Sequence, residues 1–489
     1  MAGLAACSSP LPSQVCATSL TYTTTYTTAV KRELDLVFVI DDSAAMAGWQ
    51  AQLASQLPLL GALGACEECP SPRDVHIGVV SSDLGVGAAL NAAIPGCSGQ
   101  GDGGQFRYQP EGMCTDTTLD PGATFISNTG DDWNFSTPGD AAGSGVGKVF
   151  ECIAQLGDGG CGFGQPLAAL DRALGADGQP PPAANAGFLR PDATLGIVFI
   201  SSEDDCSVRA DSTLFSASSA TGPLTHYRCN QAGHVCQAPN GDSIAPFIAP
   251  PPGVMTADGV PTVSLENCQS NEAGELTPVS KFVADIKALK PDPDNQILVS
   301  AIVGPPSPYA VEWVASAASG GAAWPRVAPS CGTEDADGNG AFGEPGVRLT
   351  QFATSFPDSV VSSICDPSYT EAFVALDESV ASDFGPPPCL PANIETRTDS
   401  AGNTYPDCVV TEHLTVAGSA QDISIPPCLG PPGDTACWQL APGAQGCSGP
   451  GQQVIVQNEP VGPDPAQYSA SIRVSCQLPP PGDGGACPD

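Results

Sequence analysis

The chain has 489 residues, enough for two or three domains, and its 41% hydrophobic content excludes a globally disordered protein. The net charge of −37, from 53 acidic and 16 basic residues, excludes nucleic acid and anionic lipid surfaces as electrostatic partners, because both require basic clusters. The 21 cysteines are too many for a reducing compartment, and no apolar run approaches the roughly 20 residues of a membrane span. We therefore expect a protein that works outside the cytosol.

Residues 1–33 are expected to form a tether, because the segment after Cys7 is rich in Ser and Thr and lacks apolar periodicity. The odd number of cysteines leaves one without a disulfide partner. The segment Leu4–Cys7 (LAAC) resembles the lipobox of bacterial lipoproteins, whose Cys receives a lipid after the signal peptide is removed. The resemblance implies lipidation of Cys7, a cell-envelope location at the outer membrane or cell surface, and membrane contact through this anchor alone. The alternative is an incidental thiol, since only six residues precede Cys7.

Residues 34–383 alternate short apolar runs with helical patterns. Four runs are typical of strands buried on both faces: Leu36–Ile40, Val75–Val80, Leu195–Ile200 and Ile297–Val303. The helix candidates are Trp49–Leu60, Gln165–Leu174, Val279–Lys290, Val347–Phe356 and Tyr369–Val380. This alternation predicts an α/β domain with a Rossmann-like, open, mostly parallel sheet.

Two long segments interrupt this alternation, at about residues 84–147 and 204–275. Both are rich in Gly, Pro, Asp and Cys, and both are too long for ordinary connections. We expect them to be insertions that depend on disulfides for order. Residues 384–489 contain seven cysteines between Cys389 and Cys487 and short β-like runs, which predict a small all-β module with a disordered tail.

The first buried run ends in Asp41-Asp42-Ser43-Ala44-Ala45, directly before a helical pattern. This turn resembles that of the von Willebrand factor type A domain, which carries Asp-x-Ser-x-Ser there to hold Mg²⁺. In that family a Thr and a second Asp from later loops complete the site, and the metal binds an acidic side chain of a protein partner. The resemblance covers residues 34 to about 380. It implies protein binding or adhesion at the carboxyl edge of the sheet.

The metal motif is degenerate in this chain. Asp41 and Ser43 match the first two ligands, whereas Ala45 replaces the second Ser and has no oxygen to offer. Asp158 stands where the family has Thr, and Ser202 stands where it has the second Asp. The set Asp41, Ser43, Asp158 and Ser202 is the candidate Mg²⁺ or Ca²⁺ site, in which Glu203 or Asp204 would substitute after a small loop shift. The alternative is a metal-free adhesion fold, in which Asp41 caps the following helix.

A second candidate is the loop Asp335-Ala336-Asp337-Gly338-Asn339-Gly340, which matches the first half of an EF-hand calcium loop. Its ligands would be Asp335, Asp337 and Asn339, but Gly346 occupies the position of the final bidentate Glu. The alternative is an acidic surface loop. If this loop does bind calcium, the protein would be a calcium-stabilised structural component of the envelope.

Two cysteine patterns give only weak indications of a functional site. The cluster His226-x₂-Cys229-x₄-His234-x-Cys236 resembles a zinc knuckle only loosely, and disulfide pairing of its cysteines is favoured in an oxidising space. Cys66-x-x-Cys69 is favoured as a structural disulfide over a redox pair.

The sequence contains four His and neither a Gly-x-Ser-x-Gly nor a His-Glu-x-x-His motif. We therefore do not expect the protein to be an enzyme. An unrecognised hydrolytic acid pair at Asp204 and Asp205 is the remaining catalytic alternative. The sequence thus favours an adhesive envelope protein that binds a protein ligand.

Overall fold

The computed structural model divides into two units, Lys31–Phe384 and a second unit made of Met1–Val30 with Gly385–Asp489. The residues that the structure describes are 20–27, 33–49, 52–53, 74–87, 94, 96–109, 118–129, 132–136, 145–191, 193–216, 223–246, 260–315, 323–334, 340–370, 372–373, 390–391, 393–398, 402–416, 419–428, 436–442, 452–457 and 468–479.

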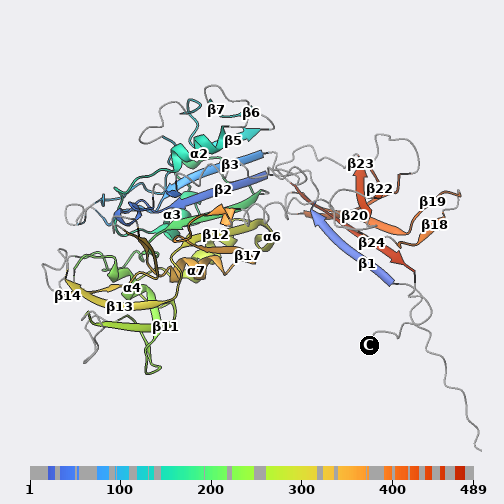
Figure 1. Ribbon diagram of the computed structural model, residues 1–489. Helices are drawn as coiled ribbons and strands as arrows, with labels where there is room; N and C mark the ends of the chain where they lie inside the picture. Colours follow the sequence, from blue (N-terminus) through green and yellow to red (C-terminus); the bar gives the residue numbers. More distant parts are fainter. Residues whose placement is uncertain are drawn as a thin grey trace, which may run out of the picture. The chain divides into compact units, whose positions relative to one another are not determined.

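A seven-stranded mixed sheet forms the centre of the larger unit, in the order β17-β12-β8-β2-β3-β5-β6 (Figure 1). The first five strands in this order run parallel to their neighbours, whereas β5 and β6 pair antiparallel. The strands are β2 (Glu33–Ile40), β3 (Asp74–Ser81), β5 (Ile126–Thr129), β6 (Asp132–Trp133), β8 (Thr194–Ser201), β12 (Ile297–Val303) and β17 (Asp358–Ser363).

The four apolar runs of the sequence lie in β2, β3, β8 and β12, so these strand positions are confirmed. Side chains alternate across the faces of β2: Leu36 and Phe38 pack with α2, whereas Val37 and Val39 pack with α3, α5 and α7. Helices therefore cover both faces, which is why these strands are continuously apolar.

The helices of the larger unit are short. Three of the expected helices are confirmed as α3, α5 and α7, each shorter than predicted. The candidates Trp49–Leu60 and Tyr369–Val380 fall mostly outside the described residues. The helical segments are η1 (Ala44–Met46), α2 (Val146–Ala154), α3 (Pro166–Leu174), η4 (Ala183–Asn185), α4 (Tyr227–Gly233), α5 (Val279–Lys287), α6 (Pro293–Gln296) and α7 (Val347–Ala353).

A five-stranded antiparallel sheet also belongs to the larger unit, in the order β10-β9-β11-β13-β14. Three of its strands come from the segment 204–275, which we expected to be an irregular insertion. The strands are β9 (His234–Gln237), β10 (Ser243–Ile244), β11 (Thr262–Ser270), β13 (Tyr309–Ala315) and β14 (Ala323–Val327). Two-stranded pairs are β4 (Thr118–Leu119) with β7 (Phe135–Ser136) and β15 (Cys331–Glu334) with β16 (Gly340–Gly343).

The predicted fold class, an α/β protein with a Rossmann-like, open, mostly parallel sheet, is therefore wrong for this chain. Strand is the dominant secondary structure among the described residues, most of the sheets are antiparallel, and the largest sheet is mixed. The cause is the half-buried antiparallel strands, whose alternating or interrupted patterns we interpreted as loops.

The smaller unit is built on a four-stranded antiparallel sheet in the order β1-β24-β20-β21. Its strand β1 lies in the segment that we expected to be a tether. Tyr22 and Thr24 are partly buried while Thr21 and Thr23 are exposed, which is the alternation of a strand with one covered face. Thr and Tyr have a high β-propensity, so they favour this strand. The strands are β1 (Leu20–Thr27), β18 (Thr396–Thr398), β19 (Thr404–Pro406), β20 (Cys408–Val416), β21 (Ser419–Ile425), β22 (Cys437–Pro442), β23 (Gln452–Gln457) and β24 (Tyr468–Leu478).

Six disulfides have both partners among the described residues, and they occur in both units. Such a density indicates an oxidising compartment outside the cytosol. No helix in the described part of the chain is long and apolar enough to cross a membrane. The pairs are Cys97–Cys161, Cys206–Cys229, Cys236–Cys268, Cys331–Cys365, Cys408–Cys476 and Cys428–Cys437.

Candidate functional site

The loops that follow the parallel strands meet at the carboxyl edge of the seven-stranded sheet. Backbone hydrogen bonds join them: the Asp41 N–H donates to Ile200 O at 2.9 Å, and the Ser82 N–H donates to Ile40 O at 3.1 Å. The Glu344 N–H, which follows β16, donates to Ser202 O at 2.8 Å. This edge is where open parallel sheets place their ligand sites.

Asp41 lies at the centre of this edge and is 2% exposed. Its Oδ1 accepts hydrogen bonds from the Ser43 N–H at 2.9 Å and from Ser82 Oγ at 3.3 Å, and its Oδ2 accepts one from Ser201 Oγ at 3.2 Å. Both carboxylate oxygens therefore already brace the surrounding loops. This arrangement leaves Asp41 poorly suited to act as the principal ligand of a cation.

The remaining residues of the predicted Mg²⁺ or Ca²⁺ set have different environments. Ser43 is buried and its Oγ donates to Glu203 Oε2 at 3.5 Å. Ser202 is buried too, and its Oγ has no hydrogen-bond partner among the described residues. Asp158 is exposed, and no hydrogen bond joins its side chain to Asp41 or Ser43 in the described part of the chain. The four residues thus do not offer a cation a ready set of free oxygens.

Asp42 lies beneath the loop that carries Asp158. The Gly160 N–H donates to Asp42 O at 2.7 Å, and a Cβ at Gly160 would lie 2.3 Å from the Asp42 carboxyl carbon. Burial, together with the neighbouring charge of Asp41, raises the pKa of Asp42 to about 8. The Asp42 carboxyl is buried, and its Oδ1 has no hydrogen-bond partner among the described residues.

A cluster of three side chains at the same edge has the chemistry of a metal site. One ligand atom from each of Glu203, His226 and Glu344 lies within 4.8 Å of the others. His226 Nδ1 lies 3.1 Å from Glu344 Oε2, and His226 Nε2 lies 3.1 Å from the carbonyl oxygen of Asp204. Asn230 Nδ2 also donates to Glu344 Oε2, at 3.1 Å.

The protonation of this cluster is set by burial and by the two carboxylates. Burial raises the pKa of Glu203 to about 8, against the lowering influence of His226. Burial alone would lower the pKa of His226, but the charges of Glu203 and Glu344 raise it to about 10. Without a metal, the cluster therefore holds an imidazolium between acidic groups.

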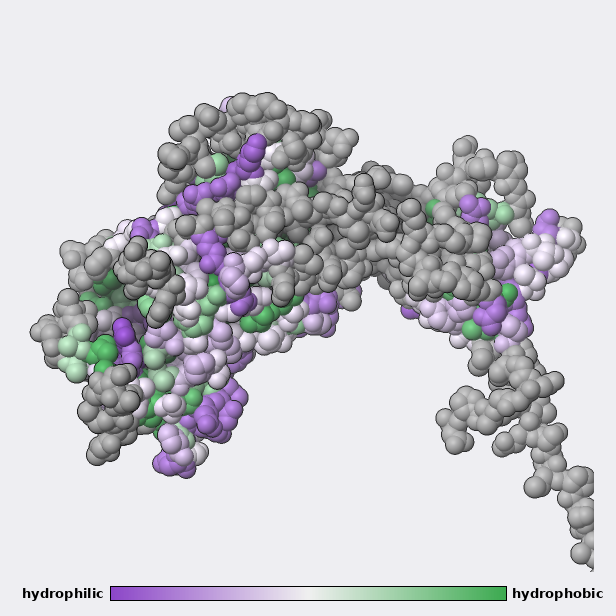
Figure 2. Space-filling view, in the orientation of Figure 1, coloured by the Kyte–Doolittle hydropathy of each residue, from purple (hydrophilic) through white to green (hydrophobic). Residues whose placement is uncertain are grey.

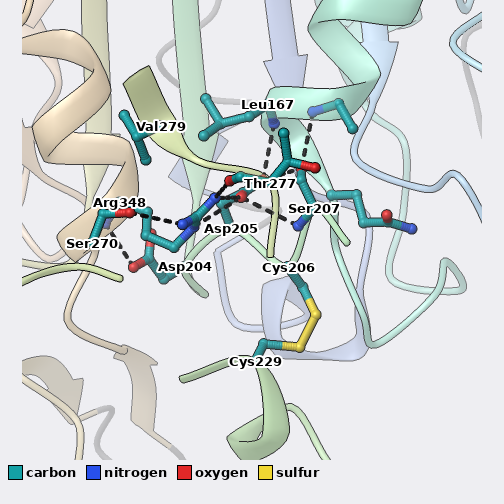
Figure 3. Close-up of polar contacts among 12 residues, drawn as sticks. Leu167, Asp204, Asp205, Cys206, Ser207, Cys229, Ser270, Thr277, Val279 and Arg348 are labelled. Carbon is teal, nitrogen blue, oxygen red and sulfur yellow. Dashed lines mark hydrogen bonds and ion pairs between the residues drawn. A yellow bond between two sulfur atoms is a disulfide. The ribbon is translucent and has the colours of Figure 1, made fainter. Parts of the chain in front are cut away.

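A buried polar network fixes the loop that carries Glu203 (Figure 3). Asp204 accepts hydrogen bonds from His234 Nε2 and from the Arg348 N–H, both at 2.8 Å. Asp205 accepts two from the Arg348 guanidinium, at 3.0 and 3.1 Å. Asp204 and Asp205 are both buried, so they support the structure and do not form an accessible hydrolytic pair.

The zinc-knuckle residues are separated by their covalent and polar partners. Cys229 is bonded to Cys206, and Cys236 is bonded to Cys268. His234 Nδ1 lies 2.8 Å from the Tyr309 hydroxyl. The cysteines thus form disulfides, as the oxidising compartment favours. His234 is held by Tyr309 and Asp204, whereas His226 lies near Glu203 and Glu344.

Several predicted residues lie outside the described residues. These are the lipidation candidate Cys7, the pair Cys66 and Cys69, and the calcium-loop candidates Asp335, Asp337 and Asn339.

Comparison with known proteins gives little further information. No protein-family model matches the chain, and no curated protein matches it. A similar solved structure is the pilus adhesin RrgA from Streptococcus pneumoniae, with 10% sequence identity and a TM-score of 0.29. The match covers 94% of this chain and 58% of the adhesin chain. A TM-score this low supports no argument about fold or function.

Proposed function

We propose that this protein is an extracytoplasmic protein-binding module that docks its partner at the carboxyl edge of the seven-stranded sheet. The observation that carries the proposal is the side chain of Phe342, which is 51% exposed on β16, two residues before Glu344. Phe342, Val361 and Val409 are the exposed large hydrophobic side chains of the described residues, and Phe342 is the one aromatic among them.

The hairpin β15–β16 holds Phe342 in place. The Trp49 indole N–H donates to Phe342 O at 3.1 Å, which ties β16 to the segment that follows β2. A Cβ at Gly332 or at Gly340 would lie 2.7 or 2.8 Å from the Phe342 ring, so both glycines let the ring lie across the hairpin. The Cys331–Cys365 disulfide joins β15 to the segment after β17. A rigid aromatic side chain of this kind is a typical interface anchor.

The described surface favours recognition of one partner over nonspecific hydrophobic binding. In the face shown in Figure 2, hydrophobic residues of the described surface form small patches separated by hydrophilic ones. Glu344, two residues after Phe342, is partly exposed, and the whole chain carries a charge of −37. We therefore expect a partner with basic groups around an apolar pocket, or one that binds together with a cation.

The resemblance of the Asp41–Ser43 turn to type A domains supports the same edge, because that family binds proteins there. We propose binding and not catalysis, because Asp204 and Asp205 are engaged in the buried network. The cysteine-rich composition and the lipobox resemblance support a place in the bacterial cell envelope.

Site-specific photocrosslinking tests this proposal. A photoreactive amino acid replaces Phe342 in one variant and Val361, an exposed residue in the middle of edge strand β17, in a matched control. After incubation with intact cells and envelope fractions, we expect a discrete crosslinked protein from position 342 and none from position 361. The F342A variant should compete at least tenfold less well than the parent chain for the same partner. Equal crosslinking from both positions, or none from position 342, would overturn the proposal.

A further inference from the structure

We propose that Glu203, His226 and Glu344 form a binding site for one divalent transition-metal ion, with Zn²⁺ as the reference ion. This inference rests on the proposed function and adds to it a metal-binding site at the edge of the sheet where the partner docks. It differs in its ion from the Mg²⁺ or Ca²⁺ site expected at Asp41 and Ser43, and it shares with that site only Glu203, which was a possible substitute ligand there.

The hydrogen bonds of His226 prepare one ring nitrogen for a metal. Nε2 faces the carbonyl oxygen of Asp204 at 3.1 Å, and a carbonyl oxygen only accepts hydrogen bonds, so Nε2 carries a proton. Nδ1 then faces Glu344 and is the nitrogen that a metal ion would take in exchange for a proton. Metal-binding histidines commonly donate their second N–H to a backbone carbonyl in this way.

The spacing of the ligand atoms is close to that of a tetrahedral site. Two ligands at about 2.0–2.1 Å from a tetrahedral zinc ion are roughly 3.3 Å apart. His226 Nδ1 and Glu344 Oε2 are 3.1 Å apart, and a Glu203 oxygen lies within 4.8 Å of both. A Glu203 side chain that moves this oxygen closer to the other two ligand atoms would complete a three-ligand set.

Three separate segments hold these side chains in place. Asp204, anchored by the Arg348 N–H, fixes the position of Glu203, and the Cys206–Cys229 disulfide ties α4, which begins directly after His226. The backbone of Glu344 is bonded to Ser202. A site built on such supported residues loses little entropy when it binds its ion.

An independent observation beside the cluster also indicates a missing polar partner. Ser202 precedes Glu203, and its carbonyl oxygen accepts the Glu344 N–H. Its hydroxyl is 1% exposed and has no hydrogen-bond partner among the described residues. A buried hydroxyl of this kind normally has a partner, such as a bound water or an ion ligand.

The donor set selects the class of metal and leaves a coordination position open. One imidazole with two carboxylates suits Zn²⁺ and similar transition-metal ions, whereas Mg²⁺ and Ca²⁺ prefer oxygen ligands alone. The Glu344 side chain is 23% exposed, so the cluster reaches the surface. A carboxylate of the docking partner is the chemistry that fits the fourth position.

Metal titration of the full chain, without any partner, tests the site. After treatment with a chelator, the parent chain is titrated with Zn²⁺ and with Mg²⁺ by calorimetry, and bound zinc is counted by elemental analysis. The test variants are His226→Gln and Glu344→Gln. The matched controls are His413→Gln in the smaller unit and Glu266→Gln at an exposed position of β11.

We expect one tightly bound zinc ion per chain in the parent and in both controls, with at least tenfold weaker zinc binding in each test variant. Magnesium should compete only weakly. Electron paramagnetic resonance of the Cu²⁺-loaded parent should show a nitrogen ligand, and the Glu344→Gln variant should give a changed spectrum. This measurement keeps the test decisive if His226→Gln does not fold.

Two results would overturn the metal site: the absence of saturable zinc binding by the parent, or unchanged zinc affinity in the test variants. A crosslink at position 342 without a zinc site would leave the proposed function standing. A zinc site without any crosslink at position 342 would leave the metal site standing and overturn the proposed function.

Discussion

Arg348 and Asp205 form an ion pair in which both side chains are fully buried, with Nη2 and Oδ2 3.0 Å apart. The Arg348 guanidinium also donates to Ser270 Oγ at 2.8 Å and to the carbonyl oxygen of Thr277. Asp205 in turn accepts the N–H of Leu167 at the start of α3. One charge pair thus links α7, α3 and the loop that carries Glu203.

Removing one member of this pair should destabilise the larger unit strongly. Arg348→Met leaves the buried Asp205 without its counter-charge, so we expect a loss of about 3–5 kcal/mol in the free energy of unfolding. Denaturant titration followed by tryptophan fluorescence measures this loss. The control is Arg326→Met, which breaks the exposed pair with Glu312 and should cost less than about 1 kcal/mol. Similar losses in both variants would contradict the structural role of Arg348.

The pH dependence of stability should report on Asp171 in α3. Burial, together with the charge of Asp285, raises the pKa of Asp171 to about 8. Because the folded state keeps its proton while the unfolded state loses it near pH 4, stability falls as pH rises from about 4 to 8, by up to about 1.4 kcal/mol per pH unit.

Asp171→Asn removes this contribution. The variant should therefore gain stability relative to the parent chain as pH rises, with little difference near pH 4. Urea titrations at pH 5 and pH 7.5 compare the two chains, and other titrating groups cancel in the difference. A stability difference that does not change with pH would show that Asp171 is ionised in the folded state.

The Gly157–Gly160 loop should tolerate a methyl group at one glycine and not at the next. Gly160→Ala places a Cβ 2.3 Å from the Asp42 carboxyl carbon, whereas a Cβ at Gly159 meets no atom within 4 Å. We expect Gly160→Ala to cost about 1–3 kcal/mol and Gly159→Ala much less. Thermal unfolding of the two variants makes the comparison. Equal midpoints would mean that the loop does not lie on Asp42.

The disulfide beside the proposed metal site should contribute to stability through the loop that it closes. Cys206 and Cys229 are 23 residues apart, and a loop of this length corresponds to about 3 kcal/mol in the chain-entropy description. The double variant Cys206→Ser/Cys229→Ser should therefore unfold at lower denaturant concentration than the parent. Replacement of Cys428 and Cys437, which belong to the smaller unit, serves as the control and should leave the larger unit unchanged.

The sequence identified the strands that are buried on both faces but not the half-buried ones. Leu36–Ile40 and Ile297–Val303 are continuously apolar because helices cover both faces of their sheet. β13, by contrast, alternates between buried and partly exposed residues, and β11 is interrupted by polar residues and Cys268. Such weak patterns between Gly- and Pro-rich segments resemble loops, so the antiparallel sheet was missed and the fold class was wrong.

The metal cluster could not be assembled from the sequence because its residues come from three distant segments. Glu203 and His226 belonged to different hypotheses, the degenerate Mg²⁺ motif and the zinc-like spacing, and Glu344 belonged to no predicted ligand set. Spacing motifs detect ligands that share one turn or helix. The backbone bond between Glu344 and Ser202, which brings two of these segments together, has no signature in the sequence.

The pairing of β1 with β24 sets an order for folding during synthesis. β1 is near the start of the chain and its partner comes more than 440 residues later, so the small sheet must wait until β24 has left the ribosome. The larger unit lies wholly between these strands and can fold first. Exported chains that stop before β24 would therefore carry β1 as an unpaired segment that is open to proteolysis.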